Sequence, residues 1–154
     1  MEVWAVGDSY EPYAGRWSRV VARDFLAWLE APPGRRWLDV GCGAGAFSAT
    51  ILDTADPAAV VGIDTSEAFL DTARRRIPDA RVEFRQGDAQ ALPFTDGAFD
   101  AAVSGLALNF LPDPSQGLAE MTRVTRPGGR GGGRVWAAPG ALHVRPRFWG
   151  SPTA

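Results

Sequence analysis

The sequence predicts an α/β protein built on a parallel sheet. Short apolar segments alternate with amphipathic ones through most of the chain, and residues 60–63 form an uninterrupted apolar run. A strand without polar positions is typical of a parallel sheet that is buried on both faces. Strands that alternate with helices at this spacing are expected to form units joined by right-handed crossovers.

One helix is predicted before the sheet begins. The first residues lack any period, and Ser18 is a suitable N-cap for a helix that runs to about Glu30. Val21, Phe25 and Trp28 recur at helical spacing, so we expect them to share one face. A Pro-Pro-Gly sequence then ends this helix.

The later elements follow in regular order. Strands are expected at 37–40, 60–63, 81–84 and 99–104, with a candidate fifth strand at 135–137. Helices are expected after the glycine loop, after Ser66 and after Asp113-Pro114. Ser66 and Asp113 are side chains that N-caps prefer, and proline is favoured in a first turn. Pro127-Gly128-Gly129 is expected to end the last helix.

Length and composition fit one globular domain. The chain has 154 residues, of which 45% are hydrophobic and 22% are charged. No apolar run reaches the roughly 20 residues that a membrane helix needs, and the N-terminus lacks a signal pattern, so we expect a cytoplasmic protein. The single cysteine, Cys42, excludes an internal disulfide and a cysteine-rich metal site, and no metal ligand set is predicted.

Glycines and carboxylates gather at the predicted carboxyl ends of the strands, where open parallel sheets bind ligands. Gly41, Gly43 and Gly45 allow a tight loop, and the helix that follows presents N–H groups that favour an anion. Asp64 ends the second strand, at the separation from this loop at which a carboxylate accepts hydrogen bonds from ribose hydroxyls. Asp88 follows the third strand on the same edge and has an acceptor for the amine of an adenine.

Two more positions extend this pattern. The N–H group of Ala89 is placed to donate to a ring nitrogen, and Asp39, just before the glycine loop, is placed to face an ammonium group. Together the residues suit a nucleoside that also carries an amino acid.

At this point the sequence resembles the class I S-adenosylmethionine-dependent methyltransferases, most of all the small-molecule enzymes related to the ubiquinone/menaquinone C-methyltransferases. The resemblance covers residues 37–129 in the family's order. Its motifs are Trp37-Leu38-Asp39-Val40-Gly41-Cys42-Gly43-Ala44-Gly45, Gly62-Ile63-Asp64, Gly87-Asp88-Ala89, Leu92-Pro93-Phe94, Phe99-Asp100-Ala101-Ala102-Val103-Ser104, Leu118-Ala119-Glu120-Met121-Thr122-Arg123-Val124 and Arg126-Pro127-Gly128-Gly129. Each motif alone is weak evidence, but the series in order is strong.

The resemblance implies a Rossmann-like, doubly wound parallel sheet, S-adenosylmethionine as the cofactor and a small-molecule methyl acceptor. Asp39 and the loop glycines would hold the methionine portion, Ser104 would border the methyl group, and Tyr13 and Trp17 would lie in a segment folded over the cofactor. The expected cofactor-binding residues are Asp39, Gly41, Cys42, Gly43, Gly45, Asp64, Thr65, Asp88, Ala89, Ser104, Tyr13 and Trp17. No residue is predicted as catalytic, because a sulfonium is already an activated methyl donor and the enzyme mainly aligns the displacement.

Three alternatives stay open at this stage. Gly41, Gly43 and Ala46 also satisfy a relaxed dinucleotide fingerprint, although that pattern gives no role to Gly87-Asp88-Ala89. The segment Gly128 to Arg134 is similar to arginine–glycine segments that bind RNA, but it does not repeat. A cofactor-binding remnant without activity is the third alternative.

The end of the chain departs from the family pattern. All 18 acidic residues lie at or before Glu120, and the six basic residues beyond it are arginines. About 25 residues follow Gly129, which is too few for the two further strands and the helix that the family usually has. We therefore expect a sheet that is incomplete at its C-terminal edge and a truncated or frame-shifted chain. The expected organisation is a segment and helix over 1–34, a cofactor-binding domain over 35–137 and an irregular tail over 138–154.

Overall fold

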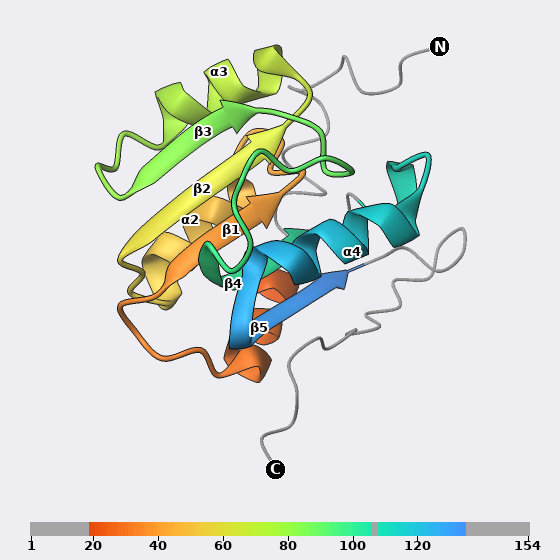
Figure 1. Ribbon diagram of the computed structural model, residues 1–154. Coiled ribbons are helices and arrows are strands. Elements are labelled where there is room, and N and C mark those ends of the chain that lie inside the picture. Colours follow the sequence, from red (N-terminus) through yellow and green to blue (C-terminus); the bar gives the residue numbers. More distant parts are fainter. Residues whose placement is uncertain (1–18, 106–107, 135–154) are drawn as a thin grey trace.

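The computed structural model describes residues 19–105 and 108–134, which form a parallel sheet between layers of helices (Figure 1). A first helix spans residues 19–29. The other elements are β1 (Arg36–Val40), α2 (Ala46–Thr54), β2 (Ala59–Asp64), α3 (Glu67–Arg76), β3 (Val82–Gln86), β4 (Phe99–Gly105), the short 3-10 helix η2 (Leu108–Phe110), α4 (Pro114–Val124) and β5 (Thr125–Arg134).

The strands confirm the predicted doubly wound, Rossmann-like sheet. Their order is β3-β2-β1-β4-β5, and every neighbouring pair is parallel. The chain moves outward from β1 through β2 to β3 and then crosses back to β4 and β5. The direction therefore reverses between β1 and β4, and the loops after these strands flank the point where such sheets bind ligands.

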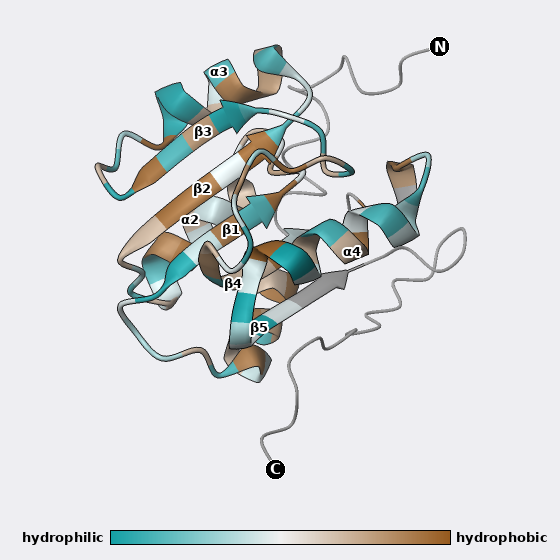
Figure 2. Cartoon of the chain, in the orientation of Figure 1, coloured by the Kyte–Doolittle hydropathy of each residue, from teal (hydrophilic) through white to brown (hydrophobic). Residues whose placement is uncertain are grey.

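Alternation along β1 divides the core between the two faces of the sheet. Trp37 packs in one cluster with the first helix and α2, whereas Leu38 and Val40 pack in a second cluster with Met121 and Val124 of α4. Figure 2 shows the apolar colouring concentrated along β2, which is buried over its central four residues. Apolar packing therefore covers both faces of the sheet. The ends of the strands lie outside this packing and are available to form a site.

The first helix buries only part of the predicted shared face. Ala22, Phe25, Leu26 and Leu29 are buried in it, whereas Trp28 is 46% exposed. Of the residues expected to share one face, Phe25 is thus buried and Trp28 lies at the exposed margin. Its ring stacks on Phe25 at a centroid distance of 6.0 Å, so it covers the core from outside instead of entering it.

The fifth strand lies earlier than the sequence pattern suggested. Thr125 pairs with Phe99, and the pairing then resumes with Arg130 opposite Ala101 and Gly131 opposite Ala102. The residues between them form an irregularity in which Gly128 has a φ of 76°. The glycine- and arginine-rich segment is thus a sheet strand and not a tail, while the candidate strand at 135–137 lies outside the described residues.

The predicted helix starts are confirmed by their caps. The side-chain oxygen of Ser66 accepts a hydrogen bond from the Phe69 N–H, and that of Asp113 accepts one from the Gln116 N–H. Helix α4 ends at Val124, before the Pro-Gly-Gly sequence that was expected to stop it. Over residues 19–105 and 108–134, none of the helices has the length and apolar content that crossing a membrane requires.

Candidate functional site

The carboxyl ends of β1 and β2 are joined directly through the backbone. The N–H groups of Gly41 and Cys42 both donate to the carbonyl oxygen of Ile63, at 2.8 and 3.0 Å. The glycine loop therefore folds over the end of β2 and not away from the sheet. This brings the loop to Asp64, the last residue of β2.

Asp64 ties two loops together with its carboxylate. One oxygen, Oδ2, accepts the N–H of Gly43 at 2.9 Å, and the other, Oδ1, accepts the N–H of Ser66 at 2.9 Å. The side chain is half-buried. A carboxylate oxygen can accept more than one hydrogen bond, so each keeps capacity for a donor from a ligand. Asp64 can thus both build the loop and bind hydroxyl groups.

The loop glycines differ in what surrounds them. Gly41, Gly43 and Gly45 all have positive φ angles, of 71°, 53° and 90°. A Cβ atom at Gly45 would lie 2.6 Å from Cδ1 of Ile77, whereas one at Gly43 would meet no atom of the described residues within 4 Å. Gly45 is therefore required by packing between α2 and α3, and Gly43 lies beside open space that a ligand could enter.

Asp39 and Cys42 are buried beneath the loop. The Asp39 side chain is fully buried, and its Oδ2 accepts the hydroxyl hydrogen bond of Ser48, on α2, at 2.8 Å. This contact fixes the start of α2 against β1, a role that the sequence did not indicate. Burial, together with the nearby Asp39 and Asp64 carboxylates, raises the pKa of the Cys42 thiol, so the thiol stays neutral and is not a nucleophile.

Asp88 lies two residues past β3 at the same edge as Asp64. The Gly87 N–H donates to the Asp64 carbonyl at 3.0 Å, which holds the segment that follows β3 against the end of β2. Oδ1 of Asp88 accepts the Gln90 N–H at 2.8 Å, so the side chain caps its own turn. Asp88 is exposed and Ala89 is buried, so one presents a carboxylate while the other anchors the turn in the core.

Ser104 lies on the other side of the sheet from Asp39. Alternation along β4 places Ser104 on the face of Ala102, which packs towards α4, whereas Asp39 bonds to α2. Ser104 is fully buried near the end of β4, and its hydroxyl oxygen has no hydrogen-bond partner among the residues described. Buried hydroxyls are usually satisfied, so this one has a donor and acceptors left for a bound group.

The remaining predicted site residues divide into two groups. Thr65 is exposed at the end of β2, and its carbonyl oxygen accepts from the Gln86 side chain at 3.0 Å. Tyr13 and Trp17 lie outside the described residues. The structure thus brings the glycine loop, Asp64 and the turn at Asp88 to one edge.

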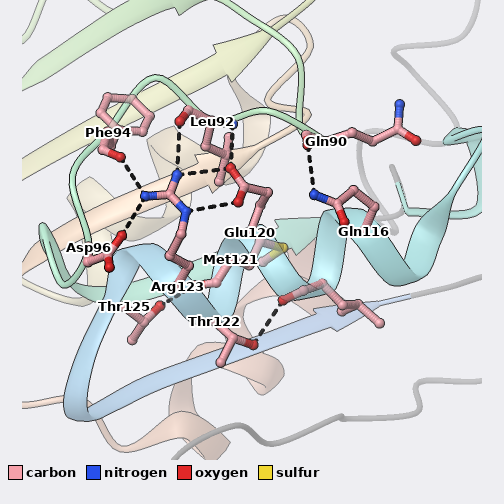
Figure 3. Close-up of polar contacts among 11 residues, drawn as sticks. Gln90, Leu92, Phe94, Asp96, Gln116, Glu120, Met121, Thr122, Arg123 and Thr125 are labelled. Carbon is pink, nitrogen blue, oxygen red and sulfur yellow. Dashed lines mark hydrogen bonds and ion pairs between the residues drawn. The ribbon is translucent and has the colours of Figure 1, made fainter.

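Sequence reasoning missed a polar cluster that borders the Asp88 turn. Arg123 and Glu120, one helical turn apart on α4, bond to each other and to the segment that follows Asp88 (Figure 3). The signal available was the i, i+3 spacing of opposite charges, which usually marks an ordinary helix-surface pair. Their long-range partners could not be foreseen from that spacing.

The strand ends present separate hydrogen-bond donors and acceptors around the glycine loop. Within the part of the chain that the structure describes, no group of three or more His, Cys, Asp or Glu side chains could hold a metal. Open space beside Gly43, a carboxylate at the end of β2 and the first N–H groups of α2 instead offer hydrogen-bond partners for hydroxyls and a carboxylate.

Known proteins share this order of strands and loops. Residues 38–131 match the family described as "Methyltransferase domain". A demethylmenaquinone methyltransferase of Renibacterium salmoninarum is 42% identical over 115 residues, which are 75% of this chain and 45% of that protein. This chain therefore spans less than half the length of that relative.

Two solved structures have the same fold. The candidate methyltransferase in complex with the Trm112 methyltransferase activator of Haloferax volcanii has a TM-score of 0.73 and 28% identity, over 82% of this chain and 54% of that one. The [4+2]-cyclase SpnF has a TM-score of 0.67 and 32% identity, over 79% of this chain and 44% of that one.

Proposed function

The chain belongs to the methyltransferase domain family, and on that premise we propose that it binds S-adenosylmethionine and transfers the methyl group to a small molecule. The observation that carries the proposal is the Asp64 carboxylate, which joins the glycine loop to the start of α3 beside the open space at Gly43. A nucleoside with two ribose hydroxyls is the ligand that uses such a carboxylate best.

The proposed binding divides among the strand ends. Asp64 would accept from the ribose, the turn at Asp88 and Ala89 would hold the adenine, and the N–H groups at the start of α2 would face the methionine carboxylate. Asp39 supports this site from below through Ser48. Ser104, with its buried hydroxyl, would border the reacting group from the α4 face.

Methyl transfer asks little acid–base chemistry of this chain. When bound, S-adenosylmethionine supplies a methyl group on a positively charged sulfur, which needs no further activation. The residues of the chain would bind, orient and exclude water, so alignment accounts for the rate. The relative from Renibacterium salmoninarum makes demethylmenaquinone the first acceptor to assay. We also propose a cytoplasmic location for the protein.

A thermal melt with S-adenosylhomocysteine tests cofactor binding. At 100 times its dissociation constant this ligand stabilises the folded chain by about 2.7 kcal/mol, which for a chain of this size raises the Tm by about 5–10 °C. NAD is the control, since it carries adenosine but no methionine. A Tm that rises with neither ligand, or with NAD alone, would refute the proposal.

A second assay separates binding from transfer. The SpnF structure carries the name of a cyclase, so the fold alone does not prove methyl transfer. Incubation with methyl-labelled S-adenosylmethionine and demethylmenaquinone should transfer label to the quinone. Ligand binding without labelled product from any small acceptor would leave a cofactor-binding protein and overturn the transferase half of the proposal.

A further inference from the structure

The segment between β3 and β4, residues 87–98, is attached to α4 along its length. It begins with the turn at Asp88 and ends at the start of β4, and it has no regular helix or strand of its own. Figure 3 shows Gln116, Glu120 and Arg123 of α4 directed towards it. Asp113, Gln116, Glu120 and Arg123 recur at i, i+3, i+7 and i+10, so they share one face of α4.

Arg123 uses all five of its N–H donors in this attachment. Its Nε and one terminal nitrogen hold the two Glu120 oxygens, at 2.8 and 2.9 Å. The same nitrogen donates to the Leu92 carbonyl at 3.0 Å. The other terminal nitrogen donates to the Phe94 carbonyl and to Asp96, each at 2.8 Å. A planar guanidinium offers five such donors, and a lysine ammonium offers only three.

Glu120 adds a contact of its own to the segment. Its Oε2 accepts the Leu92 N–H at 2.8 Å, so both backbone groups of Leu92 are held by the pair on α4. The Glu120 side chain is only 14% exposed. An exposed ion pair is worth little, but this pair fixes backbone groups that have no strand to pair with.

A second attachment lies nearer to Asp88. The side-chain oxygen of Gln90 accepts the Asp113 N–H at 2.8 Å, and the Gln90 carbonyl accepts from the Gln116 amide at 3.2 Å. Gln90 also donates its own N–H to Oδ1 of Asp88 at 2.8 Å. The Asp88 turn is therefore held from β2 through Gly87 on one side and from α4 on the other.

We propose that Arg123 and Gln116 are positioning residues that hold the Asp88 turn in the geometry that distinguishes adenine from other purines. This rests on the proposed function, in which the Asp88 carboxylate accepts from the adenine amine. Both residues bond to backbone carbonyls of the segment that follows Asp88, so each acts on Asp88 through that backbone. Loosening the attachment should therefore reduce selectivity for the base more than it reduces binding in general.

The test compares two ligands that differ only at the base. S-inosylhomocysteine has a carbonyl oxygen where S-adenosylhomocysteine has the amine, so it should bind the unaltered chain at least about tenfold more weakly, as the loss of a hydrogen bond to a charged group implies. Calorimetric titration of the full chain gives the ratio of the two dissociation constants. For Arg123→Lys we expect the ratio of the two dissociation constants to fall to about threefold or less. Gln116→Ala is a milder change at an exposed residue, so its ratio should lie between that of Arg123→Lys and that of the unaltered chain.

Arg81→Lys is the matched control. Arg81 also holds a carboxylate with two nitrogens, at 2.8 and 3.1 Å to Asp79, but it lies before β3, at the opposite end of that strand from Asp88. Its ratio should equal that of the unaltered chain. A merely structural role would weaken both ligands equally and leave the ratio unchanged in every variant, which would overturn the inference.

The failures of the two proposals look different. An unaltered chain that binds S-adenosylhomocysteine but not more tightly than S-inosylhomocysteine would overturn the positioning role, together with the contact between Asp88 and the adenine amine, and would leave cofactor binding itself standing. An unaltered chain that binds neither ligand would refute the proposed function and the inference with it. Since Gln116 is exposed, its variant gives an answer even if Arg123→Lys does not fold.

Discussion

Alanine at Gly43 should separate the stability of the glycine loop from its binding. Gly43 has a φ of 53°, so alanine there carries a left-handed backbone cost of about 1–2 kcal/mol. Among residues 19–105 and 108–134, no atom lies within 4 Å of the new methyl group, so packing against them adds nothing to that cost. The Gly43 N–H that donates to Asp64 is retained. The methyl group would, however, enter the open space where we place the cofactor.

Gly34→Ala is a matched control for the same backbone strain. Gly34 has a φ of 76° and nothing within 4 Å of a Cβ, but it precedes β1 and lies outside the glycine loop. Both variants should lower the free energy of unfolding in urea by a similar amount, about 1–2 kcal/mol. Only Gly43→Ala should weaken S-adenosylhomocysteine, by about tenfold or more. Equal ligand affinity in the two variants would show that the space at Gly43 is not the cofactor site.

Three further outcomes follow from the contacts. Gly45→Ala should cost more stability, about 2–5 kcal/mol in urea unfolding, because its methyl group meets Ile77 as well as adopting a φ of 90°. Asp64→Asn should weaken the binding of S-adenosylhomocysteine in calorimetry, because the amide replaces one of the two acceptor oxygens with an NH2 donor, which would face a backbone N–H group of Gly43 or Ser66; unchanged affinity would contradict our assignment. Hydrogen bonds from Arg123 lower the pKa of Glu120 against the effect of burial. The stability that Glu120 contributes is therefore present above its ordinary pKa of 4.5 and lost as the pH falls below it, so Tm should fall less for Glu120→Gln than for the unaltered chain between about pH 6 and about pH 3.

The order of strands and helices could be predicted because local signals and burial agreed. The apolar run of β2, the caps at Ser66 and Asp113 and the glycine loop each appear in the structure as expected. The shared face of the first helix did not show which side chains are buried, because Trp28 fits the helical period yet stacks on Phe25 while exposed. Periodicity finds an apolar stripe, but it does not decide which large side chain lies at its margin.

The fifth strand could not be found by composition. Strand signals rest on branched and aromatic side chains, and residues 125–134 have almost none. Here the pairing with β4 is made by backbone groups, and glycine has the same backbone N–H and C=O groups as other residues. Position 129 requires glycine, since a Cβ atom there would lie 2.7 Å from the Asp100 carbonyl oxygen. The segment that is similar to RNA-binding arginine–glycine sequences is thus a paired strand, in which Gly131 is buried.

The contacts at the strand ends that could be anticipated and those that were missed differ in the distance over which they act. The meeting of Asp64 and Gly43 at one edge could be predicted because a strand end and a glycine loop are local signals that the parallel fold brings together. The partners of Arg123 lie 27 to 31 residues away in sequence, on a segment without regular structure. Such contacts depend on how α4 packs across the sheet, and local sequence patterns do not predict that packing. In a fold whose chemistry needs alignment more than acid–base groups, these long-range attachments are where selectivity can be set without a residue that touches the ligand.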